Sequence, residues 1–268
     1  MMRCVEAVIF DWAGTMVDHG SLAPVRAVTE LFARHGIELT DEEVRRDMGI
    51  FKKDHIRRIL QQPRITGLWN AKTGTLAVED DVEELFAEFN PLQMEVLESC
   101  SELIPGAAEI SELLQSDGVK VGSTTGYTRP MLDLLVAHAA ASGYRPDSAL
   151  CPDDVGGGRP LPWMCLKIAL LFRLSCTAAA VKVGDTVSDI LEGLNAGMWS
   201  VGVSGTGNEV GLSATDLAAL PAPERLRRSA RARETLRDAG AHYVIDSVRD
   251  LTSVLKEIDL RLASGVRP

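Results

Sequence analysis

The chain has 268 residues, 46% hydrophobic and 25% charged, which predicts one large globular domain or a core domain with a smaller second one. Its formal net charge of −10 and pI near 5.1 argue against nucleic acid or an anionic membrane surface as a partner. No apolar run is long enough to span a bilayer, and early charges argue against a signal peptide. The five cysteines form no Cys-x-x-Cys pair, which argues against a disulfide framework or zinc site, so we expect a cytoplasmic protein.

The first predicted element is the apolar run Ala7–Phe10, which has the length of a buried central strand and ends at Asp11. The chain then turns through Gly14 and Thr15. Ligands of open parallel sheets bind beyond the carboxyl ends of the strands, so Asp11 is placed to act on a ligand. Taken alone, Asp11 could equally well cap a turn or a helix.

All elements predicted for the next part of the chain are helices. They cover about residues 23–35, 41–60, 79–89 and 92–100. The second begins with a capping box formed by Thr40 and Glu43, and we expect it to continue past Gly49. We therefore predict an all-helical cap domain of residues 21–100, inserted into a core domain of residues 1–20 and 101–268.

Strands and helices alternate from Pro105 onward. Strands are predicted at about residues 119–126, 149–150, 179–183, 199–203 and 242–245, with crossover helices between them. This alternation predicts an α/β fold with a doubly wound parallel sheet. The segment 213–237 is predicted to be helical and charged, with a break at Pro221 and Pro223. The chain contains neither a Gly-x-Gly-x-x-Gly nor a Gly-x-x-x-x-Gly-Lys motif, which weakens nucleotide-binding interpretations.

Four polar features lie at the carboxyl ends of predicted strands or in the loops beyond them. They are Asp11, Thr125 with Gly126, Arg159, and Asp185 with Asp189. Carboxylates that face one crevice suit Mg²⁺, and Thr125 with the Gly126 amide could bind phosphoryl oxygens. Arg159 could neutralise developing negative charge. Together these features predict a phosphoryl-transfer site with a carboxylate nucleophile.

The chain resembles the haloacid-dehalogenase-like hydrolase superfamily in four motifs that occur in order. They are Phe10-Asp11-x-x-Gly14-Thr15, Thr125, Arg159 and Gly184-Asp185-x-x-x-Asp189. The resemblance implies a Rossmann-like core and Asp11 as the nucleophile that forms an aspartyl-phosphate. It also implies Mg²⁺ held by Asp11, the carbonyl of Ala13 and Asp185, with Asp189 supporting this site from behind.

Ala13 departs from the superfamily pattern, in which phosphatases carry a second Asp that protonates the leaving oxygen. Cleavage of a C–P bond poses a different problem, because it would expel a carbanion. An imine formed from a lysine and an adjacent aldehyde could accept those electrons. Five segments resemble the phosphonoacetaldehyde hydrolase (phosphonatase) family, namely residues 10–15, 48–55, 122–129, 158–164 and 182–189. The resemblance spans about Val5 to Gly202 and weakens after Gly207.

The family pattern implies a Schiff-base lysine two residues before an Asp-His pair, which is Lys52 here. Helical spacing agrees, because it puts Lys52 on one face with Met48 and His55, whereas Lys53 falls on another face and could lower the pKa of Lys52. We expect His55 to relay protons or orient the phosphonate, and the family places Met48 near the imine. Tyr127 and Trp12 could line the pocket. Each of these residues could instead be a packing or surface residue.

The resulting hypothesis is hydrolysis of phosphonoacetaldehyde to acetaldehyde and phosphate, as in 2-aminoethylphosphonate degradation, by a Mg²⁺-dependent enzyme. The cap would close over the core about hinges near residues 19–23 and 100–106. The family resemblance also implies a homodimer formed through the cap. Three alternatives remain. Ala13 argues against another phosphatase or a phosphomutase, and the Asp185/Asp189 pair against a haloacid dehalogenase. The third is a non-catalytic protein that binds a phosphorylated ligand.

Overall fold

The computed structural model describes residues 4–268 and contains one parallel sheet of six strands in the order β3-β2-β1-β4-β5-β6. The strands are β1 (Ala7–Phe10), β2 (Lys120–Thr124), β3 (Ser148–Leu150), β4 (Ala180–Gly184), β5 (Trp199–Val203) and β6 (Tyr243–Ile245). All five pairings are parallel, with Ile9 of β1 opposite Gly122 on one side and Lys182 on the other. The predicted strands are thus confirmed, with small shifts at their ends.

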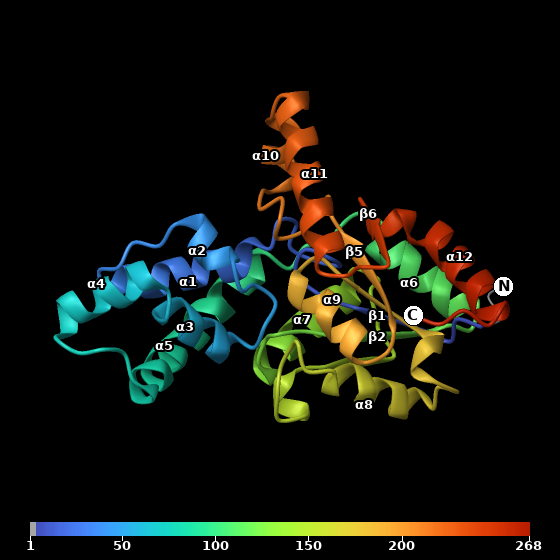
Figure 1. Ribbon diagram of the computed structural model, residues 1–268, viewed down its shortest axis with the longest axis horizontal. Coiled ribbons are helices and arrows are strands. Elements are labelled where there is room, and N and C mark those ends of the chain that lie inside the picture. Colours follow the sequence, from blue (N-terminus) through green and yellow to red (C-terminus); the bar gives the residue numbers. More distant parts are fainter. Residues whose placement is uncertain (1–3) are drawn as a thin grey trace.

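Helices cover both faces of this sheet (Figure 1). The helices of the core domain are α6 (Ala107–Ser116), α7 (Arg129–Ala141), α8 (Trp163–Phe172), α9 (Val187–Asn195), α10 (Ala214–Ala219), α11 (Ala222–Asp238) and α12 (Leu251–Ala263), of which α10 buries no residue. Side chains of a strand alternate between faces, so Val8 and Phe10 pack with α6, α7 and α12, whereas Ala7 and Ile9 pack with α8. The predicted doubly wound α/β fold is therefore confirmed.

Between β1 and α6, the described chain forms helices but no strand. They are α1 (Leu22–Arg34), α2 (Asp41–Arg45), α3 (Lys52–Leu60), α4 (Pro63–Thr73) and α5 (Glu79–Ser99). They make a lobe beside the sheet, which we call the cap (Figure 1). The exact domain boundaries near residues 20 and 100 stay a prediction.

Two predictions about the cap helices are wrong. The helix expected over 41–60 breaks after Arg45 and restarts at Lys52, and Gly49 within the break has a left-handed φ of 88°. The helices expected at 79–89 and 92–100 are one helix, α5, with Pro91 inside it. A proline removes only its own backbone donor, and packing of α5 along α1 and α3 outweighs that loss. The capping box of Thr40 and Glu43 is confirmed.

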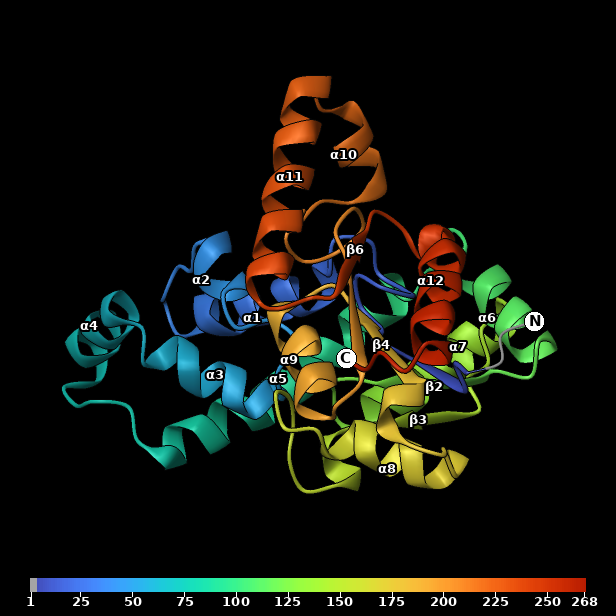
Figure 2. The ribbon, with the colours of Figure 1, turned by 45° about the vertical axis from the view of Figure 1, so that its right-hand side comes forward.

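The segment after β5 forms α10 and α11, which project away from the sheet (Figure 2). The predicted break falls at Pro221, whereas Pro223 lies in the first turn of α11, where a missing N–H is tolerated. Within residues 4–268, no helix is both long and apolar enough to cross a membrane. All five cysteines are free thiols.

Candidate active site

Three neighbouring strands end at one edge of the sheet and carry the predicted core residues there. Asp11 follows β1, Thr125 follows β2 and Asp185 follows β4, and all three are buried. The Asp11 amide still donates to the Val183 carbonyl of β4, at 2.9 Å, so the carboxylate begins at the last rung of the sheet. Because the strands are parallel and adjacent, their carboxyl ends coincide and the side chains converge.

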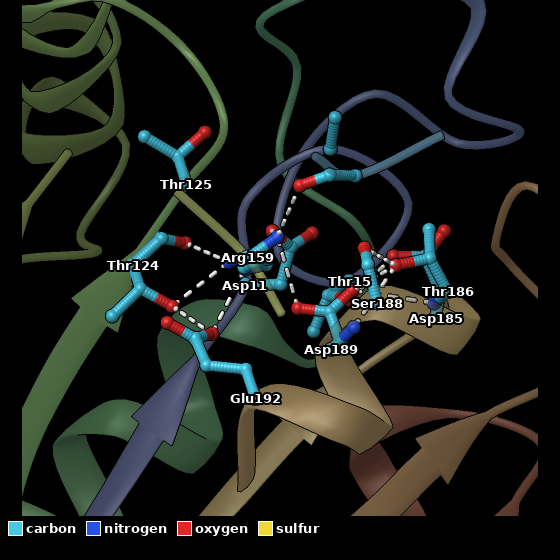
Figure 3. A network of polar contacts seen from close by, with 12 residues as sticks. Asp11, Thr15, Thr124, Thr125, Arg159, Asp185, Thr186, Ser188, Asp189 and Glu192 are labelled. Carbon is cyan, nitrogen blue, oxygen red and sulfur yellow. Dashed lines mark hydrogen bonds and ion pairs between the residues drawn. The ribbon is translucent and has the colours of Figure 1, made fainter. Parts of the chain in front are cut away.

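Arg159 reaches into this edge from the loop before α8 and is only 3% exposed. Its Nη1 donates to Asp11 Oδ1 at 2.7 Å and lies 3.0 Å from Asp189 Oδ1 (Figure 3). Its Nε donates to Glu192 Oε2 at 2.8 Å, and its Nη2 to the carbonyl and hydroxyl of Thr124 at 2.6 and 2.8 Å. Despite burial, these carboxylates hold the pKa of Arg159 well above its ordinary value. Arg159 is therefore a fixed cation beside the predicted nucleophile.

Asp11, Asp185 and Asp189 bring carboxylate oxygens within 4.8 Å of one another, but their surroundings differ. Asp189 pairs with Lys182 at 2.6 Å and with Arg159, and these cations lower its pKa against the opposing effect of burial. Asp185 receives neutral donors: Thr15 Oγ1 at 3.1 Å, Ser21 Oγ at 3.2 Å and the Asn208 amide at 2.7 Å.

Burial, followed by the charge of the neighbouring carboxylate, raises the pKa of Asp185 well above its ordinary value. Burial also raises the pKa of Asp11, and the charge of Asp189 adds to it. Two buried carboxylates with raised pKa values fit a bound cation, whose charge would favour their ionised form. The Ser21 hydroxyl contacts the Ala13 carbonyl oxygen at 3.0 Å and also contacts Asp185. The Ala13 carbonyl, which was predicted to bind the metal together with Asp11 and Asp185, therefore lies close to Asp185.

The cap supplies the opposite wall of the site through Lys52, the first residue of α3. Lys52 is 4% exposed, and its Nζ lies 3.7 Å from Met48 Sδ and 5.3 Å from the centre of the Tyr127 ring. Burial lowers the pKa of Lys52 to about 8, opposed by nearby carboxylates, Asp11 first, and reinforced by the charge of Arg159. Roughly a tenth of the lysine is then neutral at pH 7.

The adjacent Lys53 has a different environment from the one suggested by the sequence. Its side chain forms ion pairs with Glu79 and Glu83 of α5. The cation that reinforces the low pKa of Lys52 is thus Arg159 of the core.

The break between α2 and α3 docks the cap onto the core. The Met48 carbonyl accepts from Ser188 Oγ at 3.1 Å, the Gly49 carbonyl from Arg159 Nη1 at 3.3 Å, and the Lys52 amide donates to the Gly126 carbonyl at 3.2 Å. A Cβ on Gly49 would lie 2.3 Å from Ser188 Oγ, so a glycine is needed here.

Docking leaves a small, partly open pocket between cap and core. Its lining includes Asp11, Ala13, Met48, Lys52, Thr125, Gly126, Tyr127 and Arg159, that is, most of the predicted site residues. Asp11, the predicted nucleophile, and the buried amine of Lys52 thus line one small space from opposite lobes, which suits a substrate of few atoms.

Comparisons with known proteins agree with this geometry. The sequence pattern of haloacid dehalogenase-like hydrolases matches residues 5–197. A phosphonoacetaldehyde hydrolase from Hahella chejuensis is 47% identical over 264 residues, which cover 98% of this chain and 90% of that protein. A bifunctional phosphonoacetaldehyde hydrolase/aminoethylphosphonate transaminase from Clostridioides difficile is 44% identical, over 95% of this chain and 40% of that protein. The crystal structure of a phosphonoacetaldehyde hydrolase like protein from Oleispira antarctica is 45% identical, with a TM-score of 0.97 over 100% of this chain and 97% of that one.

The chain belongs to the phosphonoacetaldehyde hydrolase family. It is thus a hydrolase of the haloacid dehalogenase-like superfamily, as the motifs predicted.

Two predicted residues of this family member lie behind the cavity wall. His55 is fully buried one turn after Lys52, and its Nε2 donates to the Val44 carbonyl at 2.7 Å, which leaves Nδ1 as the unprotonated nitrogen. Burial, then the Lys52 charge, lowers the pKa of His55 to about 3, so the ring is neutral at ordinary pH. Trp12 packs edge-on against Tyr144 at 5.3 Å between ring centres. The roles proposed for His55 and Met48 stay predictions.

Several polar residues of this hydrolase site were given no role from the sequence. Thr15, Thr124 and Lys182 lie in the quoted motifs or segments, whereas Ser21, Glu192 and Asn208 lie outside them. The position of Lys182 inside the apolar strand β4 could have predicted an acidic partner, because a buried charge needs one. Ser21 and Asn208 lie in loops without a local pattern, and only the fold brings them to Asp185.

Proposed function

We propose that this chain hydrolyses the C–P bond of phosphonoacetaldehyde to acetaldehyde and inorganic phosphate. The observation that carries the proposal is the shared cavity, in which the buried Lys52 amine faces Asp11 while the acid of the superfamily phosphatases is replaced by Ala13. An amine in place of an acid suits a leaving group on carbon better than one on oxygen.

The first step is imine formation at Lys52. The neutral amine attacks the aldehyde carbon and the N–C bond forms. With uptake of one proton from solvent the C–O bond breaks and one water leaves, which gives a protonated imine. The low pKa of Lys52, about 8, favours the neutral amine that this step needs. Met48 and Tyr127 enclose the amine with a thioether and an aromatic ring, which keeps it poorly solvated.

The second step is cleavage of the C–P bond by Asp11. A carboxylate oxygen attacks phosphorus, the P–C bond breaks, and its electron pair moves onto the imine nitrogen to give an enamine and an aspartyl-phosphate. Thr125, the Gly126 amide and Arg159 would hold the phosphonate oxygens in line with Asp11.

Two hydrolyses complete the cycle. Water attacks the phosphorus of the aspartyl-phosphate and releases phosphate and Asp11. The enamine takes up a proton on carbon, and a second water hydrolyses the resulting imine to acetaldehyde and free Lys52. One water was released at the start, so the whole reaction consumes one.

We propose Mg²⁺ as the cofactor, held by Asp11, the Ala13 carbonyl and Asp185. When bound, Mg²⁺ would offset the negative charge that the phosphonate adds to this acidic site. Asp189 supports the site by fixing Lys182 and Arg159 around it.

Borohydride reduction in the presence of phosphonoacetaldehyde tests the central step. Reduction of the imine should leave a stable alkyl group on Lys52, found by peptide mass spectrometry, together with permanent loss of activity. Lys53 is the matched control, because it is adjacent and ion-paired with α5. Labelling of Lys53, or no labelling during active turnover, would contradict the proposal.

The wider setting is also a proposal. We infer a cytoplasmic homodimer that acts in 2-aminoethylphosphonate degradation, supported by the relative that joins this hydrolase to an aminoethylphosphonate transaminase. Light scattering coupled to size-exclusion chromatography would test the dimer.

A further inference from the structure

The β5–α10 loop, residues 204–213, connects three parts of the molecule. It begins on the core, where the Gly205 amide donates to the Asp246 carbonyl at 2.9 Å. Thr206 then joins it to the segment after β1: its hydroxyl donates to the Gly14 carbonyl at 2.7 Å and its carbonyl accepts from the Gly20 amide at 2.7 Å. The next residues face both Asp185 and the cap.

On the core side, this loop sets the orientation of Asp185. The Asn208 amide donates to Asp185 Oδ2 at 2.7 Å, the shortest hydrogen bond described for that carboxylate. A Cβ on Gly207 would lie 2.2 Å from Asp185 Cβ, so a glycine lets the loop backbone lie directly against Asp185. A shift of the loop would therefore turn or release the carboxylate.

On the cap side, the same loop holds Arg45, the last residue of α2. Arg45 Nη1 donates to Asn208 Oδ1 at 3.2 Å and to the Gly20 carbonyl at 2.9 Å, and Nη2 donates to the Gly211 carbonyl at 3.1 Å. Asn208 Nδ2 donates back to the Arg45 carbonyl at 3.3 Å. The Arg45 side chain is 10% exposed, and its Nε lies 2.9 Å from Asp41 of the same helix.

We propose that Asn208 is a positioning residue that couples docking of the cap helix α2 to the orientation of Asp185, and thereby to Mg²⁺ affinity. Its backbone holds the carboxylate and its side chain holds Arg45, so neither contact can move without the other. Linkage then requires that Mg²⁺ favours the docked cap to the same extent that docking favours Mg²⁺. The inference rests on the proposed function only for the Mg²⁺ site.

Arg46 provides a matched control for Arg45. It is the next residue in the chain, its side chain is 52% exposed, and its ion pair, 3.9 Å to Glu42, stays within α2. Replacing Arg46 by alanine removes the same charge from the cap without touching the β5–α10 loop.

Hydrogen–deuterium exchange of the whole protein, with and without Mg²⁺, tests the coupling without substrate. Mg²⁺ should slow exchange across residues 41–52 in the parent protein and in Arg46→Ala. The slowing should disappear in Arg45→Ala and Asn208→Ala, whose Tm shows that they remain folded. Equal slowing in all four proteins would overturn the proposal.

Calorimetric titration with Mg²⁺ gives the size of the coupling. We expect the Kd to rise about tenfold in Arg45→Ala and in Asn208→Ala, as for residues that orient a metal ligand, and to stay unchanged in Arg46→Ala. The double variant should bind no more weakly than either single one, and Arg45→Lys, which keeps one donor, should recover part of the affinity. Excess Mg²⁺ should restore phosphate release. Additive effects, or equal Kd values, would overturn the coupling alone, whereas a parent protein that binds no Mg²⁺ would overturn the proposed metal site as well.

Discussion

Two buried lysines, one in the core and one in the cap, have opposite chemistry although both are shielded from water. Lys182 of β4 lies 2.6 Å from Asp189 and 3.5 Å from Glu192, and despite burial and the nearby Arg159 these carboxylates raise its pKa. Lys52 of α3 faces the Met48 thioether and the Tyr127 ring, and burial lowers its pKa to about 8. The partner, rather than the burial, decides whether a lysine is a permanent cation or an available nucleophile.

Lys52→Met removes the buried amine of the cap and should have the largest effect. Turnover should fall by at least about 10³-fold, because the amine that we propose forms the imine is lost. Stability should be kept or increase, because methionine fills the site without an ion to desolvate. Phosphate release and thermal unfolding measure the two effects. A variant that keeps even a tenth of the turnover would exclude Lys52 as the Schiff-base lysine.

Lys182→Met removes the buried amine of the core, and we expect it to lower the free energy of unfolding. Without Lys182, the carboxylates of Asp189 and Glu192 have Arg159 as their one paired cation among the described residues. Losing one partner of a buried ionic group costs about 3–5 kcal/mol of folding stability. Urea unfolding measures the loss. If the variant unfolds at the same urea concentration as the parent, Lys182 does not compensate these carboxylates.

Met48→Glu would give Lys52 a carboxylate partner like those of Lys182. In the parent, kcat/KM should rise with pH up to about 8 and then level off, as the Lys52 ammonium loses its proton. A carboxylate 4 Å from the amine favours the ammonium and should move this midpoint upward by about 1 to 3 pH units. Met48→Gln, of the same size without the charge, is the control. An unchanged midpoint in Met48→Glu would mean that another group titrates.

Lys53→Ala should have the smallest effect. The side chain forms ion pairs with Glu79 and Glu83 near the surface of the cap, so Tm should fall by no more than about 3 °C and turnover should stay within about twofold. Steady-state kinetics would detect a larger loss, which would assign a role in the reaction to the second lysine.

Residues that follow a strand could be predicted because their placement needs only a local pattern and one rule of topology. Asp11 and Asp185 each follow an apolar run, and parallel strands bring such positions to one edge. The break between α2 and α3 could not be predicted in this way. There, the carbonyls of Met48 and Gly49 accept hydrogen bonds from Ser188 and Arg159, more than 100 residues away, which outweighs the local preference for a continuous helix.

Lys52 and Asn208 differ in the same way: the first could be predicted from the sequence and the second could not. Lys52 could be found because a family spacing indicated it. The helical face that it was expected to share with Met48 does not form, because Met48 precedes α3, although the two side chains still lie 3.7 Å apart. Asn208 acts through one backbone amide and one side chain, and a loop in contact with Asp185 and Arg45 leaves no periodic mark on the sequence. Its neighbour Gly207 is likewise explained only by its close approach to Asp185.

The hydrogen bond from Arg159 to Asp11 has a consequence for the order of events. Without substrate, the guanidinium already donates to Asp11, the carboxylate that we propose attacks phosphorus. If the phosphonate binds Arg159 as proposed, it would compete with Asp11 for this guanidinium, and a weaker hydrogen bond would leave the carboxylate oxygen more nucleophilic. On this proposal, binding of the substrate to Arg159 would also activate Asp11.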